Sequence, residues 1–357
     1  MSILTNAKNW GFNFVQEAEP TNPYEGLTWY DTTSSIFFVY HESDWMEISF
    51  LPITYGNLYG YTFGGITSAW ISTIDRITFP FDSGSASDVG NLTQSKSFTT
   101  ACNSASYGFI MGGRIGAFTS IIDRITFPFD SGIASTVGNL STSNSSSAAC
   151  NSSIHGFNMG GYITTSFSTI DRITFPFDSG TASNVGNLSY SVYSSSGCNA
   201  SHYGYCMAGR SGTIISNIDR IAFPFNSGSA SGVGNLSQTV STASGCNSSN
   251  YGYRMGGYPG NSNYLSRIDR ITFPFDSGNA SAVGNLSYTV YNNSAGCNSS
   301  NYGYNSGGYQ VASIYLSSVS RITFPFDSGT ADNVGNLSIS TSSASGTDGT
   351  DFVTLFR

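Results

Sequence analysis

The stretch Arg76–Gly84 reads RITFPFDSG, and the same string or a near copy begins again at five later positions. The later copies start at Arg124, Arg172, Arg220, Arg270 and Arg321, so the spacings are 48, 48, 48, 50 and 51 residues. Two other markers keep this register: VGNL follows each copy, and an aromatic run that closes with a Gly pair precedes it, as in YGYTFGG (59–65). In one copy the run reads YGYCMAG and ends at Ala208 and Gly209. A unit repeated at this period predicts a repeat architecture, in which neighbouring units bury one another's apolar faces.

Each unit contains four segments that are typical of short strands. The first is rich in small residues, the second is the aromatic run, the third is IDRITFPF and the fourth is VGNL. In the third segment Ile77, Phe79 and Phe81 share one face, as residues at a spacing of two do on a strand. Pro80 cannot donate a ladder hydrogen bond, so we expect this strand to end at Pro80 or to lie on an edge. Four strands per unit predict an all-β propeller, with a β-solenoid as the alternative.

Composition excludes several classes of protein. Ser, Asn and Gly are abundant and disfavour long helices, whereas 14% aromatic residues provide too much buriable surface for a disordered chain. The net charge is −8 and Lys96 is the one lysine after residue 50, so no basic stripe is available for nucleic acid. No apolar run is long enough to span a membrane. The N-terminus lacks the basic head and apolar core of a secretory signal, so we expect synthesis in a cytosol.

The order of segments resembles a Kelch-type β-propeller: an aromatic run, Gly-Gly, a variable loop, then a strand that ends in an aromatic residue and an Asp turn. The Gly pair carries the resemblance, because a tight exit from the second strand needs positive φ or close backbone approach. The repeats depart from the family in one respect. Kelch blades usually carry a Trp in the fourth strand, where this chain has VGNL.

The two ends of the chain together predict a further blade. Residues 344–357 (ASGTDGTDFVTLFR) align with the first two strands of a unit, and residues 28–48 resemble the third and fourth strands of a Kelch blade, with Trp45 in the Trp position. Joining residues 25–50 with 344–357 gives a composite closing blade and seven four-stranded blades within residues 25–357. The alternative is six blades with a separate N-terminal module.

The N-terminal segment has a second resemblance. The pattern P-x-x-P-x-x-G-x-x-W-Y-D-T, continued by V-Y and a Trp, runs from Pro20 to Trp45 and is similar to a short module of bacteriophage tail-fibre and other virion proteins. All Glu residues of the chain also lie between Glu17 and Glu47, a sharp break in composition. The resemblance implies that residues 1–24 form an extended arm docking onto another virion protein. The docking residues would be Trp10, Phe12, Phe14 and Pro20.

Recurring Cys and charged residues are expected to be structural. One Cys recurs in the first segment of five units, which favours a small buried side chain near the axis: Cys102, Cys150, Cys198, Cys246 and Cys297. Cys206 faces Cys198 across a predicted hairpin, and we favour free thiols over a disulfide. The Asp-Arg pair of IDR recurs in five units, which predicts bonds between blades. For the Asp of the DSG turn, an Asx turn is favoured over a Ca²⁺ site.

The variable loop between Gly-Gly and IDR carries the candidate ligand site. It places an aromatic residue near the same point in most copies: Trp70, Phe118, Phe167, Tyr264 and Tyr315. Loops of one type gather on one face of a propeller, and aromatic rings among hydroxyl groups suit sugars. The alternative is that these rings fold back over the outer strands. No metal or cofactor site is expected, because Cys and His residues lack zinc-site spacing.

These observations favour a non-enzymatic protein. The preferred function is a structural or receptor-binding part of a bacteriophage virion, made in the host cytoplasm and working outside the cell as part of a symmetric assembly. Its N-terminal arm would dock onto other virion proteins, and its loop face would contact host surface glycan or protein. One alternative is an intracellular Kelch-like scaffold that binds a peptide. The other is a polysaccharide-degrading propeller, which needs paired carboxylates although the repeats contain no Glu.

Overall fold

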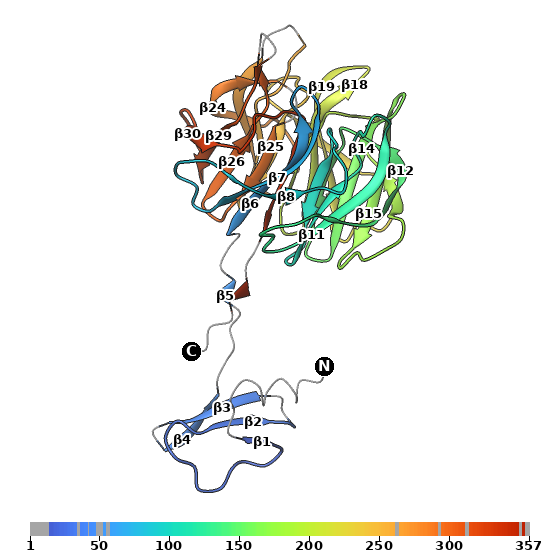
Figure 1. Cartoon of the computed structure of the whole chain (residues 1–357). Coiled ribbons are helices and arrows are strands. Elements are labelled where there is room, and N and C mark those ends of the chain that lie inside the picture. The colour runs from blue at the N-terminus through green and yellow to red at the C-terminus, as the bar shows by residue number, and fades with distance from the viewer. Residues whose placement is uncertain are drawn as a thin grey trace. The chain divides into compact units, whose positions relative to one another are not determined.

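The computed structural model describes residues 14–33, 36–41, 43–47, 53–54, 58–260, 264–291, 294–310, 314–349 and 352–353. Every regular element in these ranges is a β-strand (Figure 1). The chain divides into two compact units, one of Met1–Tyr55 with Phe352–Arg357 and the other of Gly56–Asp351. The predicted all-β class is therefore confirmed.

The second unit is a β-propeller-like ring of four-stranded antiparallel sheets, six of them in the described residues, each called a blade below. Blade 1 comprises β31 (Ser345–Gly349), β6 (Tyr59–Ile66), β7 (Trp70–Thr78) and β8 (Ser87–Asn91), and blade 2 comprises β9 (Thr100–Asn103), β10 (Tyr107–Met111), β11 (Thr119–Thr126) and β12 (Ser135–Asn144). Blade 3 comprises β13 (Ala148–Asn151), β14 (His155–Tyr162), β15 (Ser166–Thr174) and β16 (Ser183–Asn187), and blade 4 comprises β17 (Ser196–Asn199), β18 (Tyr203–Ser211), β19 (Thr213–Ala222) and β20 (Ser231–Asn235). Blade 5 comprises β21 (Ser244–Asn247), β22 (Tyr251–Met255), β23 (Leu265–Thr272) and β24 (Ser281–Val290), and blade 6 comprises β25 (Ala295–Asn298), β26 (Tyr302–Ser306), β29 (Ser318–Thr323) and β30 (Asp332–Asn336). A short ribbon of β27 (Tyr309–Gln310) and β28 (Ile314–Tyr315) extends blade 6.

The first strand of each blade lies against the first strands of its two neighbours, in the circular order β31, β9, β13, β17, β21, β25 and back to β31. This closed order excludes the solenoid alternative, because a solenoid stacks its units along a line. The local predictions also hold. Strand β7 ends at Thr78, just before Pro80, and the turn after β6 places Gly64 and Gly65 at φ of +55° and +114°.

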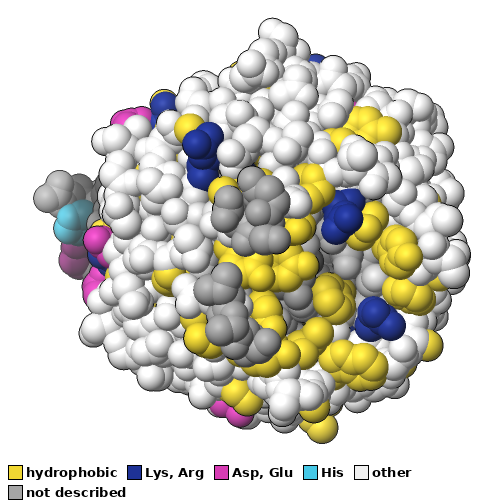
Figure 2. Space-filling model, turned by 90° about the horizontal axis from the view of Figure 1, so that it is seen from above, with side chains coloured by type: hydrophobic (Ala, Val, Ile, Leu, Met, Phe, Trp, Pro, Cys, Tyr) yellow, Lys and Arg dark blue, Asp and Glu magenta, His cyan; other side chains and the backbone are white. Residues whose placement is uncertain are grey.

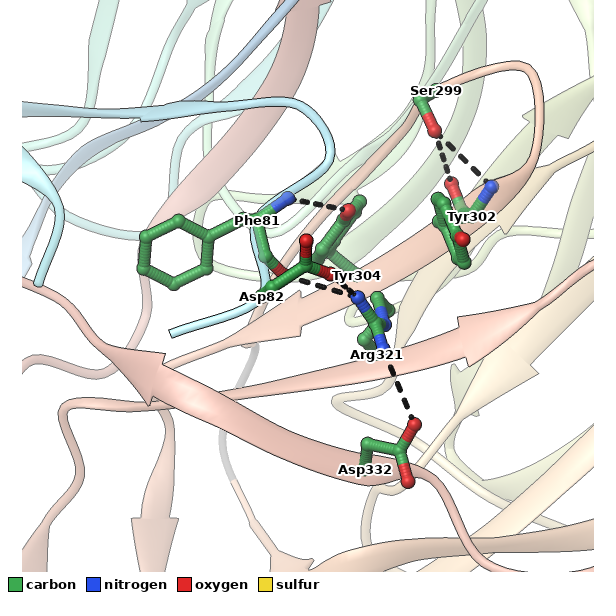
Figure 3. A network of polar contacts seen from close by, with 7 residues as sticks. All are labelled: Phe81, Asp82, Ser299, Tyr302, Tyr304, Arg321 and Asp332. Carbon is green, nitrogen blue, oxygen red and sulfur yellow. Dashed lines mark hydrogen bonds and ion pairs between the residues drawn. The ribbon is translucent and has the colours of Figure 1, made fainter. Parts of the chain in front are cut away.

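The IDR residues join neighbouring blades, as the sequence predicts. The buried Asp75 of blade 1 accepts hydrogen bonds from the backbone and hydroxyl of Ser338 in blade 6. The Arg works in the opposite direction around the ring. Arg321 of blade 6 pairs with Asp82 and donates to the Phe81 carbonyl in blade 1 at 3.5 Å, where the Tyr304 hydroxyl also meets the Phe81 amide at 3.1 Å (Figure 3). The turn aspartates therefore serve as partners of Arg.

The axis of the ring is packed by thiols against glycines. A Cβ at Gly204 of blade 4 would lie 2.2 Å from the Sγ of Cys150 in blade 3, so only a glycine fits there. The same fit recurs at Gly60, Gly156, Gly252 and Gly303, each beside a Cys of the preceding blade. All six cysteines are buried and free, so the expected small buried side chains are confirmed and Cys198 does not pair with Cys206.

The predicted composite seventh blade is wrong. Strand β31 pairs with β6, with Ser345 opposite Phe63 and Gly349 opposite Tyr59, so the C-terminal segment supplies the missing first strand of blade 1. The physical reason lies in the first repeat, because residues 51–57 (LPITYGN) carry Leu, Ile and Tyr in the segment where the later repeats carry the small residues that the crowded axis requires. One strand from the C-terminus is enough to close the ring.

The N-terminal segment forms its own sheet. Strands β1 (Phe14–Gln16), β2 (Thr28–Asp31), β3 (Ile36–His41) and β4 (Asp44–Glu47) pair in this order, with β1 parallel to β2. The Trp29 ring stacks on Phe38 at 5.0 Å and meets Trp45 edge-on at 5.5 Å. Trp45 therefore packs within this sheet and has no place in a propeller blade. In the same unit, β5 (Ile53–Thr54) pairs with β32 (Phe352–Val353).

The prediction that residues 1–24 form an extended arm is wrong for residues 14–24. Phe14 begins strand β1 and Pro20 is buried, because the chain from residue 14 onward belongs to the N-terminal sheet. Phe14 keeps 38% of its surface exposed. Trp10 and Phe12 lie outside the described residues.

One blade interface contains a fully buried ion pair. The Lys96 Nζ lies 2.9 Å from the Asp123 Oδ2, and both side chains have no exposed surface. Burial lowers the pKa of Lys96, although Asp123 opposes the shift. Asp123 also accepts hydrogen bonds from the hydroxyls of Thr93 and Thr136. In other repeats the position of Lys96 holds Asn144, Val192, Val240, Val290 and Thr341, so this cation is particular to one interface.

The buried IDR aspartates should make stability depend on pH. Burial raises the pKa of Asp171 above its ordinary value of 3.8, although two hydrogen bonds from Ser141 oppose the shift. The folded carboxyl group therefore holds its proton to a higher pH than the unfolded one. Its contribution to stability is complete below the unfolded pKa and is lost as the pH rises through the folded pKa.

We therefore expect the Asp171→Asn variant to gain stability relative to the unmodified protein as the pH rises from about 4 to about 7, since only the unmodified protein must ionise a buried group. Denaturant unfolding at a series of pH values measures this difference. A difference that stays constant over the range would contradict the raised pKa.

Candidate functional site

The connections between the second and third strands of the blades form one end of the ring, called the hairpin face below. Figure 2 views the molecule from this side. The residue after each Gly pair forms a backbone bridge with the loop that enters the innermost strand, as Tyr258 does with Ser241. This position therefore lies on the axis side of the face. It is occupied by Ile66, Arg114, Tyr162, Arg210, Tyr258 and Tyr309.

Five tyrosines of blades 5 and 6 form a continuous cluster on this face. Tyr291 is at its centre: it stacks on Tyr264 at 5.0 Å and meets Tyr258 edge-on at 5.0 Å. Tyr309 lies 6.3 Å from Tyr291 and 5.2 Å from Tyr315, which extends the cluster along the β27–β28 ribbon. We call these five residues the tyrosine cluster. All five are half-buried, so each keeps part of its ring in solvent.

A smaller aromatic group covers blades 2 to 4. The Tyr162 ring lies 4.8 Å from Tyr193 and 6.0 Å from Phe118. The Arg114 guanidinium lies over the Phe118 ring at 4.9 Å. Figure 2 shows hydrophobic side chains gathered around the centre of the face, with basic side chains among them and acidic side chains only near the outline.

The face is electrostatically unusual for a chain of net charge −8. The loops that form it contain no Asp or Glu, whereas the opposite end of the ring carries the DSG turns of five repeats and the NSG turn of the fourth. Burial raises the pKa of Tyr291, with a further contribution from Tyr258 and Tyr264, while Arg210 opposes the shift. The Tyr291 hydroxyl thus stays protonated at neutral pH and can donate a hydrogen bond.

The structure separates the five predicted ligand-binding residues. Tyr264 and Tyr315 join the tyrosine cluster, and Phe118 joins the smaller group. Trp70 lies apart against the next hairpin, where its Cζ3 is 3.5 Å from a Cβ placed at Gly116. Phe167 is half-buried on β15, across from Gly161.

Sequence reasoning missed the residues at the centre of the face. The position after the Gly pair (I, R, Y, R, Y and Y in successive repeats) is as variable as the loop beyond it. Tyr193 and Tyr291 come from a different segment, between VGNL and the small-residue strand, which reaches the same face. Variation at a fixed position directly after the Gly pair (Ala208–Gly209 in the fourth repeat) was the available signal.

Other hollows of the ring are less suited to a ligand. At the end opposite the hairpin face, a cup of about 590 Å³ is lined by Asn, Ser and Ala of blades 2 to 5. Its asparagines already form hydrogen bonds between neighbouring blades. For example, the Asn247 Oδ1 accepts a hydrogen bond from the backbone N–H of Asn199 at 3.2 Å. The hollow along the axis holds only about 80 Å³ among small residues. A groove of about 460 Å³ on the hairpin face is lined by Arg210, Ile214, Thr239, Tyr258, Pro259 and Gly260.

Within the described residues, no three His, Cys, Asp or Glu side chains meet at distances that would hold a metal ion. That part of the chain also contains no helix long and apolar enough to cross a bilayer.

Comparison with known proteins supports the fold. No protein-family model matches the sequence, and no curated protein matches it either. Among solved structures, the structure of YjhT is similar to this chain with a TM-score of 0.65 and 10% identity. The similarity covers 80% of this chain and 99% of that one. At this identity it supports the β-propeller-like architecture alone.

Proposed function

We propose that this chain is a carbohydrate-binding, receptor-facing component of a bacteriophage virion, and that its ring is a six-bladed Kelch-like propeller. The observation that carries the proposal is the tyrosine cluster, whose half-buried rings and hydroxyls lie together on one face. Sugars present apolar C–H faces beside hydroxyl groups, and such a surface matches both features. Binding is favoured over cleavage because the loops of this face hold no carboxylate to act as an acid or base.

The virion setting rests on the tail-fibre resemblance of Pro20–Trp45. It gains support from the N-terminal sheet, which is a compact unit of its own and suits an attachment module. Residues 1–13, with Trp10 and Phe12, would contact another virion protein. Mass spectrometry of purified phage particles tests this setting, and absence of the chain from particles would refute it.

The binding proposal is tested by truncating tyrosines that do not hold the ring together. We expect Tyr264→Ala and Tyr315→Ala each to weaken glycan binding by about fivefold to tenfold, since each removes one ring of the cluster. Tyr24→Ala removes a tyrosine that is 62% exposed in the N-terminal unit and is the matched control. Binding is measured on arrays of bacterial surface polysaccharides. Equal binding by all three variants and the unmodified protein would contradict the assignment of the face.

A further inference from the structure

Two arginines on the hairpin face differ from all other arginines that the structure describes. Arg114 follows Gly112 and Gly113, and Arg210 follows Ala208 and Gly209 at the equivalent position, on the axis side of the face. Within the described residues, no hydrogen bond or ion pair engages either guanidinium, and the Nε of each is buried without a partner. The Arg114 guanidinium lies over the Phe118 ring, 4.9 Å from its centroid.

The remaining described arginines all have polar partners. Those of the IDR motif reach the turn of the next blade: Arg76 to Asp130, Arg124 to Asp178, Arg172 to Asn226, Arg220 to Asp276, Arg270 to Asp327 and Arg321 to Asp82. Arg254 is buried against Asp269, and Arg267 donates to the Ser237 hydroxyl at 3.1 Å. Each of these guanidinium groups therefore has at least one polar partner, whereas those of Arg114 and Arg210 have none among the described residues.

The surroundings of these two cations favour an anion. No carboxylate lies in the loops of the face, so an arriving anion meets no repulsion there. Arg210 lines the groove of about 460 Å³ beside Tyr258, and it is close enough to Tyr291 to oppose the rise in its pKa. A cation beside stacked rings can pair with a carboxylate while a ring covers the sugar face.

We propose that the hairpin face recognises acidic polysaccharide, with Arg210 and Arg114 pairing with carboxylate groups of the sugar and the aromatic clusters packing on its rings. The inference rests on the proposed carbohydrate-binding function and specifies its ligand class. It also explains why an acidic chain keeps cations on a face whose structure does not require them.

The test uses bacterial capsular and O-antigen polysaccharides, neutral and acidic, on one array. Each acidic polysaccharide is also printed after its carboxyl groups have been chemically reduced to alcohols, so that the two forms differ only in charge. We expect the unmodified protein to prefer the acidic form by about tenfold or more, and the preference to fall with added salt. Arg210→Gln and Arg114→Gln should each remove about tenfold of the binding to the acidic form and leave binding to the reduced form unchanged.

Arg220→Gln is the matched control. It removes the same charge from the β18–β19 hairpin. Arg220 lies opposite Tyr205 in this hairpin, whereas Arg210 lies opposite Ile214 near the tip. Its binding should equal that of the unmodified protein, and circular dichroism confirms that each variant is folded. Equal binding to acidic and reduced polysaccharide would overturn this inference but leave the carbohydrate-binding function standing. Failure to bind any polysaccharide on the array would overturn both.

Discussion

Deletion of residues 345–357 is expected to abolish cooperative folding of the ring. The deletion removes β31, which pairs with β6 along its whole length and lies between the innermost strands of blades 2 and 6. It also removes the hydrogen bonds of Ser345 with Thr99 and of Thr347 with Asn103, both 2.8 Å long. Each buried polar group left without a partner costs about 1–3 kcal/mol, so the loss rivals the about 5–15 kcal/mol that stabilises a typical domain.

Thermal unfolding followed by circular dichroism measures this effect, together with size-exclusion chromatography for aggregation through the exposed edge of β6. A chain that stops after residue 351 keeps β31 and is the control, so its ring should unfold as the full chain does. A synthetic peptide of residues 341–351 added to the shortened chain should restore part of the transition. A cooperative transition at the original temperature in the shortened chain would show that the ring does not depend on β31.

Replacing the buried lysine is expected to produce the second large effect. Lys96→Val leaves the Asp123 carboxylate buried without its cation, and breaking such a pair costs about 3–5 kcal/mol. Valine occupies this position in three other repeats, so the side chain itself fits the site. Denaturant unfolding measures the loss as a lower midpoint with an unchanged slope.

The double variant Lys96→Val with Asp123→Ser separates the ion pair from packing. Ser320 holds the position of Asp123 in blade 6, where its hydroxyl meets that of Ser287 at 2.9 Å, so a serine is compatible with this interface. We expect the double variant to recover most of the lost stability, because no charge remains buried. A double variant as unstable as Lys96→Val alone would indicate that the lysine stem, and not the charge pair, stabilises the interface.

The repeat made the framework of the ring predictable. A sixfold copy of one pattern fixes which residues alternate, where Pro80 ends a strand and why Arg76 and its equivalents bond the next blade. Each of these follows from backbone chemistry within one unit and its neighbour. The fit of Cys150 against Gly204 could not be assigned from the sequence, because it depends on which blade each thiol faces.

The closure and the centre of the site were harder to predict. Both ends of the chain lack the repeat pattern. Because Trp45 resembles the Trp of a Kelch blade, we predicted that the N-terminal segment forms part of a blade, whereas its aromatic residues pack on one another. The site combines two segments of the chain that lie about 30 residues apart, one with Tyr258 and the other with Tyr291. Only the structure shows that these two rings meet. Of the five predicted rings, Tyr264 and Tyr315 lie in the tyrosine cluster, and both come from the two repeats whose loops carry inserted residues.

The Gly-pair hairpins have a consequence for how such a protein can change. The side-chain bonds that connect blades 6 and 1 come from the middle of the second and third strands and from the turn after the third strand. Added residues and altered side chains occur instead at the tip of the hairpin between these two strands. Mutation can therefore change the proposed binding surface in small steps without breaking the contacts that hold the blades together. Exchange of a whole tip between repeats would change the surface in one step, because every tip joins the same two strands of a blade.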